Sequence, residues 1–344
     1  MNGAIESSPF LAACRGEDAS RLPVWFMRQA GRSLPEYRAV RGEGSILDAI
    51  AKPDLATEIT IQPVRRYGVD AAILYSDIVV PAWAVGFGID IVPGVGPVVD
   101  RPFRSAADLQ RLRPLEAEVD TPFVLETIRN VVAELDVPLI GFAGAPFTVA
   151  SYLIEGKPSR TYGLTKSMMH GEPKLFLELL DRLADLAIAS LRSQIIAGAS
   201  AIQLFDSWVG ALSAAEYSKF VLPATTKVMA GVADLAVPRI HFGVGTGELL
   251  GLMASAGVEV MGIDWRIPLD EARNRIPDGM SVQGNLDPAR IAAGAEVAAA
   301  GTREVLAANN GRPGHIFNLG HGVWPELDPG VLAHVVDLVH SEGR

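Results

Sequence analysis

Two arginines that flank a short run of uncharged residues are the first feature of the sequence with chemical potential. Arg28 and Arg32 follow the apolar run at residues 23–27. The positions between them hold uncharged residues, Gln29, Ala30 and Gly31. Small residues let a ligand approach the backbone, and each guanidinium can bind a carboxylate through two parallel hydrogen bonds. A solvated first helical turn, with the arginines paired to neighbours such as Glu36, fits the same spacing, so both interpretations stay open.

A single acidic residue, Asp77, interrupts residues 74–80, a run that is otherwise suited to burial. Burying a carboxylate costs several kcal/mol unless the group is paired or accepts hydrogen bonds. One explanation is a cap at the end of a strand. The other is a carboxylate that receives a cationic ligand or a ligand with N–H groups. The residues alone leave this choice open.

His321 and Ser207 are further candidates for a polar role in a cleft. His321 stands between Gly320 and Gly322, which we expect to leave it little packing and to expose it. Ser207 lacks a surrounding G-x-S-x-G elbow, so a binding hydroxyl is favoured over a nucleophile. No histidine lies in a His-x-Glu-x-x-His pattern and Cys14 is the only cysteine, which argues against a zinc site. No lysine falls in or directly after a predicted strand, which argues against Schiff-base and pyridoxal chemistry.

The composition indicates an acidic globular protein that prefers arginine to lysine. Its 344 residues carry a net charge of −10, which argues against a general nucleic-acid or anionic-membrane surface. Only six of the 30 basic residues are lysine, and arginine is suited to bidentate capture of carboxylate or phosphate. A single cysteine and an N-terminus without signal-peptide features predict a cytoplasmic protein. The longest uncharged run, residues 137–154, is broken by prolines and glycines, so no membrane span is predicted.

Short apolar runs alternate with amphipathic stretches along the whole chain, the pattern of a parallel α/β sheet. Eight runs are predicted as strands: residues 23–27, 71–75, 138–142, 201–205, 239–242, 259–263, 281–283 and 315–318. Predicted helices include residues 173–197, 269–275 and 288–309. A doubly wound sheet is the alternative, but eight strands close a barrel and no phosphate fingerprint follows the first strand. The glycines at 243–247 are not in G-x-G-x-x-G register.

The sequence therefore predicts a single (β/α)8 TIM-type barrel domain over residues 1–344, with residues 1–22 as an N-terminal extension. In such barrels the chemistry lies at the carboxyl ends of the strands. The polar residues that follow the predicted strands should meet at that rim: Arg28, Arg32, Asp77, Tyr152, Asp206, Ser207, Asp264, Asn285 and His321. Paired acids such as Asp77 with Asp206 or Asp264 keep a glycosidase open as an alternative. Nothing in a glycosidase site explains the two arginines, and the tryptophans are not clustered.

Six blocks of the sequence resemble the uroporphyrinogen decarboxylase family. They are residues 23–32, 75–78, 141–148, 203–207, 283–288 and 318–322. The resemblance runs in order from about Pro23 to the C-terminus, and the Arg-Gln-Ala-Gly-Arg block is nearly diagnostic. It implies a (β/α)8 barrel, a homodimer, and catalysis without metal or cofactor in porphyrin and heme biosynthesis. The implied reaction converts the four acetate side chains of uroporphyrinogen III, and of its isomer I, to methyls, giving coproporphyrinogen III and four CO2.

The resemblance also implies roles for particular residues. The loop from Arg28 to Arg32 binds substrate carboxylates, and Asp77 binds the central pyrrole N–H groups. Tyr152, Ser207 and His321 line the cleft. Arg28 is given a role in supplying the proton, and Asp77 in stabilising the cation that protonation creates. Ser33 departs from the family, which commonly has Tyr at this position, and this leaves the packing behind the loop open.

Two alternatives follow from the same resemblance. Cobalamin-dependent methyltransferases share the barrel but resemble zinc enzymes with a His-x-Cys and a later Cys, and Cys14 is the only thiol here. A noncatalytic tetrapyrrole-binding or regulatory barrel stays possible. Decarboxylation of reduced uroporphyrinogen distinguishes an enzyme from a carrier.

Overall fold

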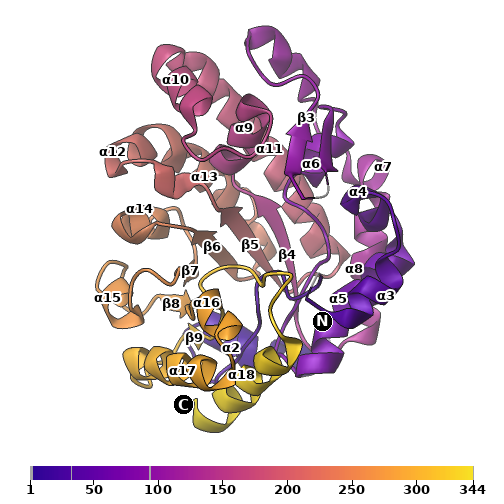
Figure 1. The fold of residues 1–344 in the computed structure, drawn as a ribbon. Helices are drawn as coiled ribbons and strands as arrows, with labels where there is room; N and C mark the ends of the chain where they lie inside the picture. The colour runs from indigo at the N-terminus through magenta and orange to yellow at the C-terminus, as the bar shows by residue number, and fades with distance from the viewer. Residues whose placement is uncertain (1–2, 32, 93, 344) are drawn as a thin grey trace.

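Seven parallel strands form one curled sheet, with helices packed around its outside (Figure 1). The computed structural model describes residues 3–31, 33–92 and 94–343. The sheet contains, in spatial order, β1 (Ala72–Ile73), β4 (Leu139–Gly144), β5 (Ala201–Asp206), β6 (Arg239–Gly243), β7 (Val260–Gly262), β8 (Ser281–Gln283) and β9 (His315–Ile316). Spatial order follows chain order, so each connection crosses over through the helical layer. The prediction of a parallel α/β sheet is confirmed.

Helices cover the outer face because a parallel sheet must bury both faces. Those of the first half are α3 (Pro35–Arg41), α4 (Ile46–Ile50), α5 (Pro53–Tyr67), α6 (Val80–Ala84), α7 (Ala117–Asp120), α8 (Pro122–Glu134), α9 (Pro146–Glu155), α10 (Gly163–Gly171) and α11 (Pro173–Ala197). Those of the second half are α12 (Ala214–Glu216), α13 (Leu222–Ala230), α14 (Leu250–Ala254), α15 (Leu269–Arg273), α16 (Pro288–Ala292), α17 (Ala295–Asn309) and α18 (Pro329–Glu342). Among the residues described, no helix has the length and apolar character needed to cross a bilayer.

The predicted helix at 173–197 is confirmed as α11, which ends at Gly198. The helix predicted at 269–275 ends two residues early, at Arg273. The single helix predicted at 288–309 is wrong. Gly294 has φ 103°, a conformation that residues with side chains rarely adopt, and it separates α16 from α17. The apolar periodicity continues across this break, which is why the pattern alone did not reveal it.

Seven of the eight predicted runs contain a strand, and residues 23–27 contribute only an isolated bridge between Val24 and Phe317. Side chains replace some of the ladder partners in this segment, although Trp25 N–H still donates to the Phe317 carbonyl (3.3 Å). The backbone N–H of Val24 donates to Asp70 Oδ2 (2.8 Å), and that of Met27 donates to Asn318 Oδ1 (3.0 Å). The N–H of Phe26 donates to Gln29 Oε1 (2.9 Å). The segment is therefore held in place without forming a regular strand.

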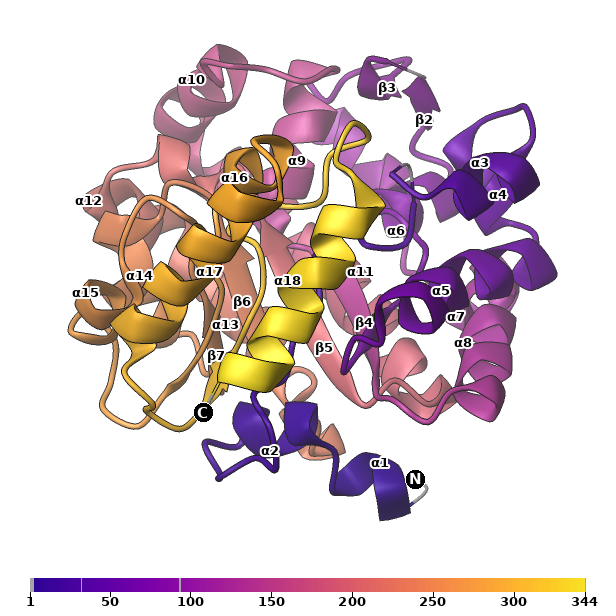
Figure 2. The ribbon, with the colours of Figure 1, turned by 60° about the horizontal axis from the view of Figure 1, so that its bottom comes forward.

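Two elements outside the main sheet flank its ends. An antiparallel hairpin of β2 (Ile89–Val92) and β3 (Gly96–Val99), which the sequence analysis missed, lies above the sheet in Figure 1. At the opposite end, α1 (Gly3–Glu6) and α2 (Pro9–Cys14) lie beneath the strands (Figure 2). The Ser281 hydroxyl of β8 donates to the carbonyl of Ala13 (2.8 Å) and so ties α2 to the sheet.

His315 of β9 makes folding stability depend on pH. Its Nε2 lies 2.9 Å from the Gly284 carbonyl, its Nδ1 is buried without a partner among the described residues, and burial lowers its pKa to about 4. Below pH ~6.5 the imidazole of His315 takes up a proton in the unfolded chain but stays neutral in the native one. The free energy of unfolding therefore falls as the pH drops toward 4.

We predict that the contribution of His315 to the free energy of unfolding declines by about 3 kcal/mol between pH 6.5 and pH 4. Urea denaturation at closely spaced pH values measures this slope. His315→Asn, which does not titrate, should flatten it, whereas the exposed His334→Asn should leave it unchanged. An equal slope in the wild type and His315→Asn would contradict the assignment.

Candidate active site

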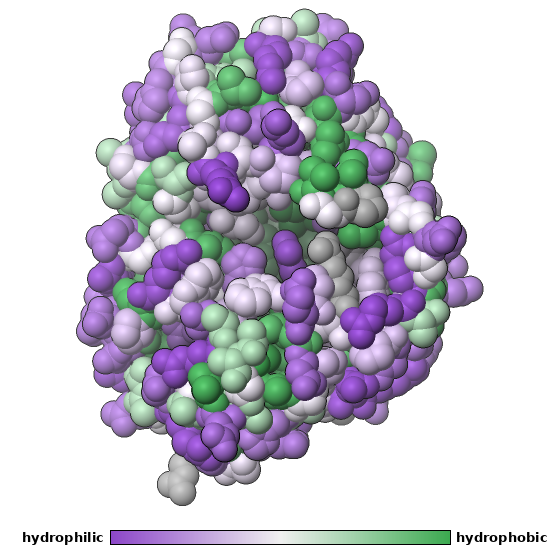
Figure 3. Space-filling view, viewed as in Figure 1, coloured by the Kyte–Doolittle hydropathy of each residue, from purple (hydrophilic) through white to green (hydrophobic). Residues whose placement is uncertain are grey.

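A cleft of about 730 Å³ opens at the carboxyl ends of the strands. This volume lies in the upper part of the range for small-molecule sites. Figure 3 shows this face hollowed near its centre, with hydrophobic residues in the hollow and many hydrophilic ones around it. Phe142, Phe205 and Phe242, at the ends of β4, β5 and β6, line the cleft and contact one another edge to face, with ring centroids 5.4 and 6.2 Å apart.

Arg28 lies at the cleft with an exposed side chain. Its φ of 61° is left-handed, which is uncommon for a residue with a side chain and tends to occur at functional sites. No carboxylate of the described residues lies within ion-pair distance of its guanidinium. Glu36, the partner in the alternative interpretation, instead pairs with Arg66. Arg28 therefore presents its charge to the cleft.

Of the residues between the two arginines, some line the cleft and one holds the loop in place. Ala30 and Gly31 line the cleft, as predicted for residues that let a ligand approach. Gln29 does not: its buried side chain accepts from Phe26 N–H and donates to the Ala71 carbonyl (3.0 Å). Both ends of its side-chain amide already hold the loop, and the binding of substrate by Gln29 stays a prediction. Arg32 lies outside the described residues.

Asp77 lines the cleft and is half-buried rather than fully buried. Its Oδ1 accepts from the backbone N–H of Val79 (3.0 Å), and its carbonyl accepts from Val80 N–H (3.2 Å). The two interpretations of Asp77 from sequence are therefore compatible. The turn into α6 fixes the carboxylate in place, and the same carboxylate faces the cleft.

Tyr152 and Ser207 both line the cleft. Tyr152 projects from α9, and its ring packs on Trp208 with centroids 3.9 Å apart. Burial, together with the negative charge of Asp77, raises the pKa of Tyr152 well above its usual range. Its hydroxyl consequently keeps its proton at neutral pH and can donate a hydrogen bond beside Asp77.

His321 lines the cleft as predicted, but its neighbouring glycines have a different purpose. A Cβ at Gly320 would lie 2.4 Å from the backbone N of Trp265, and one at Gly322 would lie 2.6 Å from Arg28 Cδ. The glycines permit close packing and do not expose the imidazole. Burial and the charge of Arg28 lower the pKa of His321. Its Nδ1 accepts from Gly322 N–H (2.7 Å), which assigns the proton of the neutral ring to Nε2.

Two acids that were expected at the rim are absent from the cleft lining. Asp206 and Asp264 are both buried. Asp264 accepts from Gly245 N–H (2.5 Å) and binds Arg266 (2.5 Å), so it organises the loops after β6 and β7. Asn285 likewise donates to the carbonyls of Asp264 and Ile267. Without a second carboxylate beside Asp77 among the described lining residues, the glycosidase alternative loses its acid pair.

Arg41, Tyr37 and Tyr75 also line the cleft, and the sequence analysis missed them. Arg41 and Tyr37 lie four residues apart on α3, a spacing that places them on one helical face and that could have revealed them. The Tyr37 and Tyr75 hydroxyls are 3.2 Å apart. Arg41 and Arg28 are the cations of the described cleft lining, and Asp77 is its anion.

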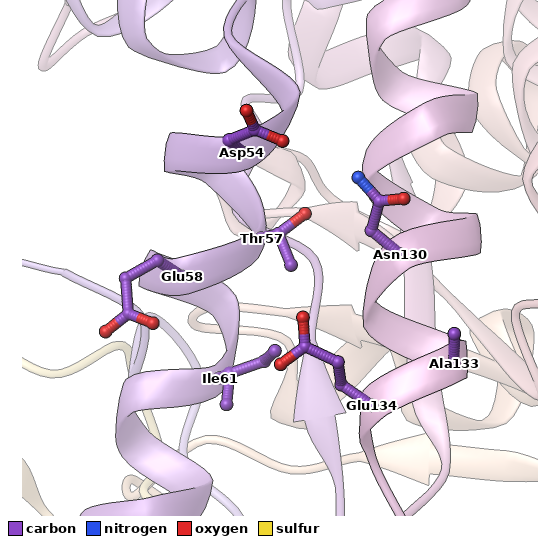
Figure 4. A pocket seen from close by; sticks show the side chains of 7 residues that line it. All are labelled: Asp54, Thr57, Glu58, Ile61, Asn130, Ala133 and Glu134. Atoms are coloured by element: carbon purple, nitrogen blue, oxygen red, sulfur yellow. The ribbon is translucent and has the colours of Figure 1, made fainter.

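Other sites in the described chain do not compete with this cleft. No group of three His, Cys, Asp or Glu residues in ranges 3–31, 33–92 and 94–343 is arranged to hold a metal ion. A second pocket lies between α5 and α8 (Figure 4). Two of its carboxylates, Glu58 and Glu134, bind Arg65 at 2.9 and 3.3 Å. Both of these carboxylates are therefore already paired with an arginine.

Comparisons with known proteins agree with the resemblance read from the sequence. A family model described as "Uroporphyrinogen decarboxylase (URO-D)" matches residues 6–342. A uroporphyrinogen decarboxylase of Salinispora tropica is 58% identical over 340 residues, covering 98% of this chain and 91% of its own length. That of Streptomyces avermitilis is 57% identical over 340 residues, covering 98% and 96%. That of Thermobifida fusca is 56% identical over 339 residues, covering 98% and 94%.

Solved structures share the fold at low identity. A methyltransferase from Methanosarcina mazei superimposes with a TM-score of 0.77 at 20% identity, covering 97% of this chain and 98% of its own. A B12-independent methionine synthase from Shewanella superimposes with a TM-score of 0.55 at 13% identity, covering 88% and 91%. These two show the architecture alone. By sequence, over nearly its whole length, the chain belongs to the uroporphyrinogen decarboxylase family.

Proposed function

We propose that the cleft converts the four acetate side chains of uroporphyrinogen III to methyl groups, giving coproporphyrinogen III and four CO2, and that it also accepts isomer I. The chain is a carboxy-lyase of porphyrin and heme biosynthesis. The observation that carries the proposal is that Arg28, which no carboxylate of the described residues binds, and the half-buried Asp77 line one cleft with aromatic rings at its floor. Cations suit the eight carboxylates of the substrate, and the rings suit its macrocycle.

The chemistry requires an electron sink, and the pyrrole ring itself provides one. A proton first adds to the ring α-carbon next to the one that bears the acetate, which gives a cation delocalised onto the acetate-bearing carbon. The bond to the carboxylate then breaks, CO2 leaves, and the bonding electrons neutralise the ring. The exocyclic methylene takes a proton to become methyl, and the ring carbon returns its proton. Each acetate thus consumes one proton overall, and no step needs a metal or an organic cofactor.

Asp77 is the catalytic carboxylate in this scheme. It accepts hydrogen bonds from the pyrrole N–H groups and stabilises the cation more than the neutral ring, which is the differential binding that catalysis requires. The attraction is larger in a site that excludes water. Because Val79 N–H already holds the carboxylate in place, little reorganisation is needed when charge develops.

The surrounding groups bind the periphery of the substrate. Arg28 binds a substrate carboxylate and positions or relays the proton, and Arg32 and Arg41 supply further carboxylate contacts. Tyr152 and the neutral His321 donate hydrogen bonds, and Ser207 contributes a hydroxyl. The arginines at the edge of the cleft match the carboxylates at the periphery of the substrate. Asp77 at its centre matches the positive charge that develops on the reacting pyrrole ring.

The architecture and setting are part of the same proposal. Residues 23–27 take the place of the eighth strand and close a (β/α)8 barrel. The barrel forms a single domain over residues 1–344, in which residues 1–22 are an N-terminal extension. Support comes from hydrogen bonds on both sides: Phe317 N–H to the Pro23 carbonyl and Asp70 N–H to the Val24 carbonyl, each 2.8 Å. A homodimer and a cytoplasmic location follow from the family resemblance and the single cysteine.

Incubation with reduced uroporphyrinogen III tests the function directly. We expect heptacarboxyl, hexacarboxyl and pentacarboxyl intermediates followed by coproporphyrinogen III, separated by chromatography after oxidation. Binding without any of these products would favour the noncatalytic carrier and reject the enzyme.

Asp77→Asn should lower kcat by about 100-fold or more, because the amide is uncharged and cannot stabilise the cation. KM should change less, since the amide oxygen still accepts from pyrrole N–H groups. Labelled CO2 release measures the effect, with the exposed Asp54→Asn as a control at wild-type rate. Near-normal turnover of Asp77→Asn would contradict the electrostatic role of Asp77.

Arg28→Lys tests the carboxylate clamp while it keeps the positive charge. Loss of the bidentate geometry should raise KM about tenfold, in line with the strength of a charge-assisted hydrogen bond. The surface variant Arg15→Lys, at a residue paired with Glu17, serves as the matched control. An unchanged KM in Arg28→Lys would show that this guanidinium does not grip the substrate.

A further inference from the structure

One buried hydroxyl behind the cleft joins three parts of the chain. Thr148 Oγ1 donates to Asp206 Oδ1 (2.7 Å) and accepts from the backbone N–H of Trp208 (3.2 Å). Thr148 and Asp206 are both fully buried, and neither lines the cleft. Other buried helix hydroxyls, such as Thr302 and Thr127, donate only to the carbonyl four residues back in their own helix. The Thr148 hydroxyl instead connects α9, β5 and the loop that follows β5.

The strand register places Asp206 on the side of the sheet away from substrate. Phe205 and Phe242 pair across β5 and β6, and both line the cleft. Successive side chains of a strand point to opposite faces, so Asp206 points outward into the helical layer. Asp206 can therefore influence the reaction only through other residues.

The Thr148 bonds complete a closed circuit that contains two cleft residues. Tyr152 follows Thr148 by one turn of α9 and packs on Trp208. Trp208 is bonded covalently to Ser207, which follows Asp206. The circuit therefore runs from Asp206 through Thr148 to Tyr152, across to Trp208, and back through Ser207. Both Tyr152 and Ser207 present hydroxyls to the cleft, so the circuit sets where those two hydroxyls stand.

The second oxygen of Asp206 lies in a polar interior. Asp206 Oδ2 is 3.7 Å from His241 Nε2, too far for a hydrogen bond, and it has no hydrogen-bond partner among the described residues. The Tyr217 hydroxyl and Thr225 Oγ1 are also buried. Burial and the charge of Asp206 raise the pKa of Tyr217, which keeps its hydroxyl a donor.

We propose that Asp206 and Thr148 are positioning residues that fix the spacing of the Tyr152 and Ser207 hydroxyls in the substrate cleft. The proposal rests on the proposed function for its kinetic readout. Its structural part, the orientation of Trp208 against Tyr152, is measurable without substrate.

Thr148→Val removes the hydroxyl with little change in volume. In the full-length chain we expect KM for uroporphyrinogen III to rise about three- to tenfold, in line with the net strength of a typical intramolecular hydrogen bond, with kcat lowered less. The near-ultraviolet circular dichroism contributed by Trp208, taken as the difference from a Trp208→Phe background, should weaken. Thr148→Ser restores the hydroxyl and should return both readouts to within about twofold of wild type.

Thr302→Val is the matched control because it deletes an equally buried helix hydroxyl in α17, and it should leave KM and the Trp208 signal unchanged. If Thr148→Val does not fold, Asp206→Ala removes the same bond from its other end. Wild-type KM in either variant, or equal defects in Thr148→Val and Thr148→Ser, would overturn the positioning role. If the wild type proves inactive, the function fails, while the dichroism of Thr148→Val still decides whether the circuit orients Trp208.

Discussion

The side chain of Arg28 lies directly against Gly322, and this contact brings the first and last loops of the chain together at the cleft. It leaves the guanidinium at the mouth and places His321 beside it. The charge of Arg28 then helps to lower the pKa of that imidazole and so keeps it neutral. The left-handed backbone of Arg28 is tolerated because Gln29 fixes the loop from behind. The position of the Arg28 guanidinium and the neutral state of His321 thus both follow from the packing of Arg28 against Gly322.

Charge is distributed very differently in the cleft and on the surface. Surface arginines such as Arg113 and Arg192 bind carboxylates directly, whereas no carboxylate of the described residues pairs with Arg28 or Arg41. An unpaired cation is available to a ligand, and a paired one would first have to lose its partner. The overall charge of −10 therefore coexists with a local site suited to anions. Asp77 supplies the opposite charge only at the point where the ring becomes cationic.

The sequence predicted most strands and cleft residues because apolar runs and the polar residues after them are local signals. Tyr152, Ser207 and His321 line the cleft for this reason. The errors arose where a side chain replaces a backbone partner or a neighbour fills space. Asp70 and Asn318 occupy N–H groups that a strand at 23–27 would have used. Asp206 points away from the cleft. These side-chain partners lie far away in the sequence, and the spacing of apolar residues within one segment contains no information about them.

The two glycines around His321 imply different consequences for missense variants. A side chain at Gly320 would meet the backbone of Trp265, which cannot move aside without disturbing the loop after β7, so such a protein would be lost to misfolding. A side chain at Gly322 would first meet the Cδ, Cγ and Cβ atoms of Arg28, a side chain that can shift more readily than backbone. That protein would accumulate normally but with its arginine displaced. Substitutions at two glycines only two residues apart would thus have different effects. A Gly320 variant would reduce the amount of folded protein, and a Gly322 variant would reduce the affinity for an anionic ligand.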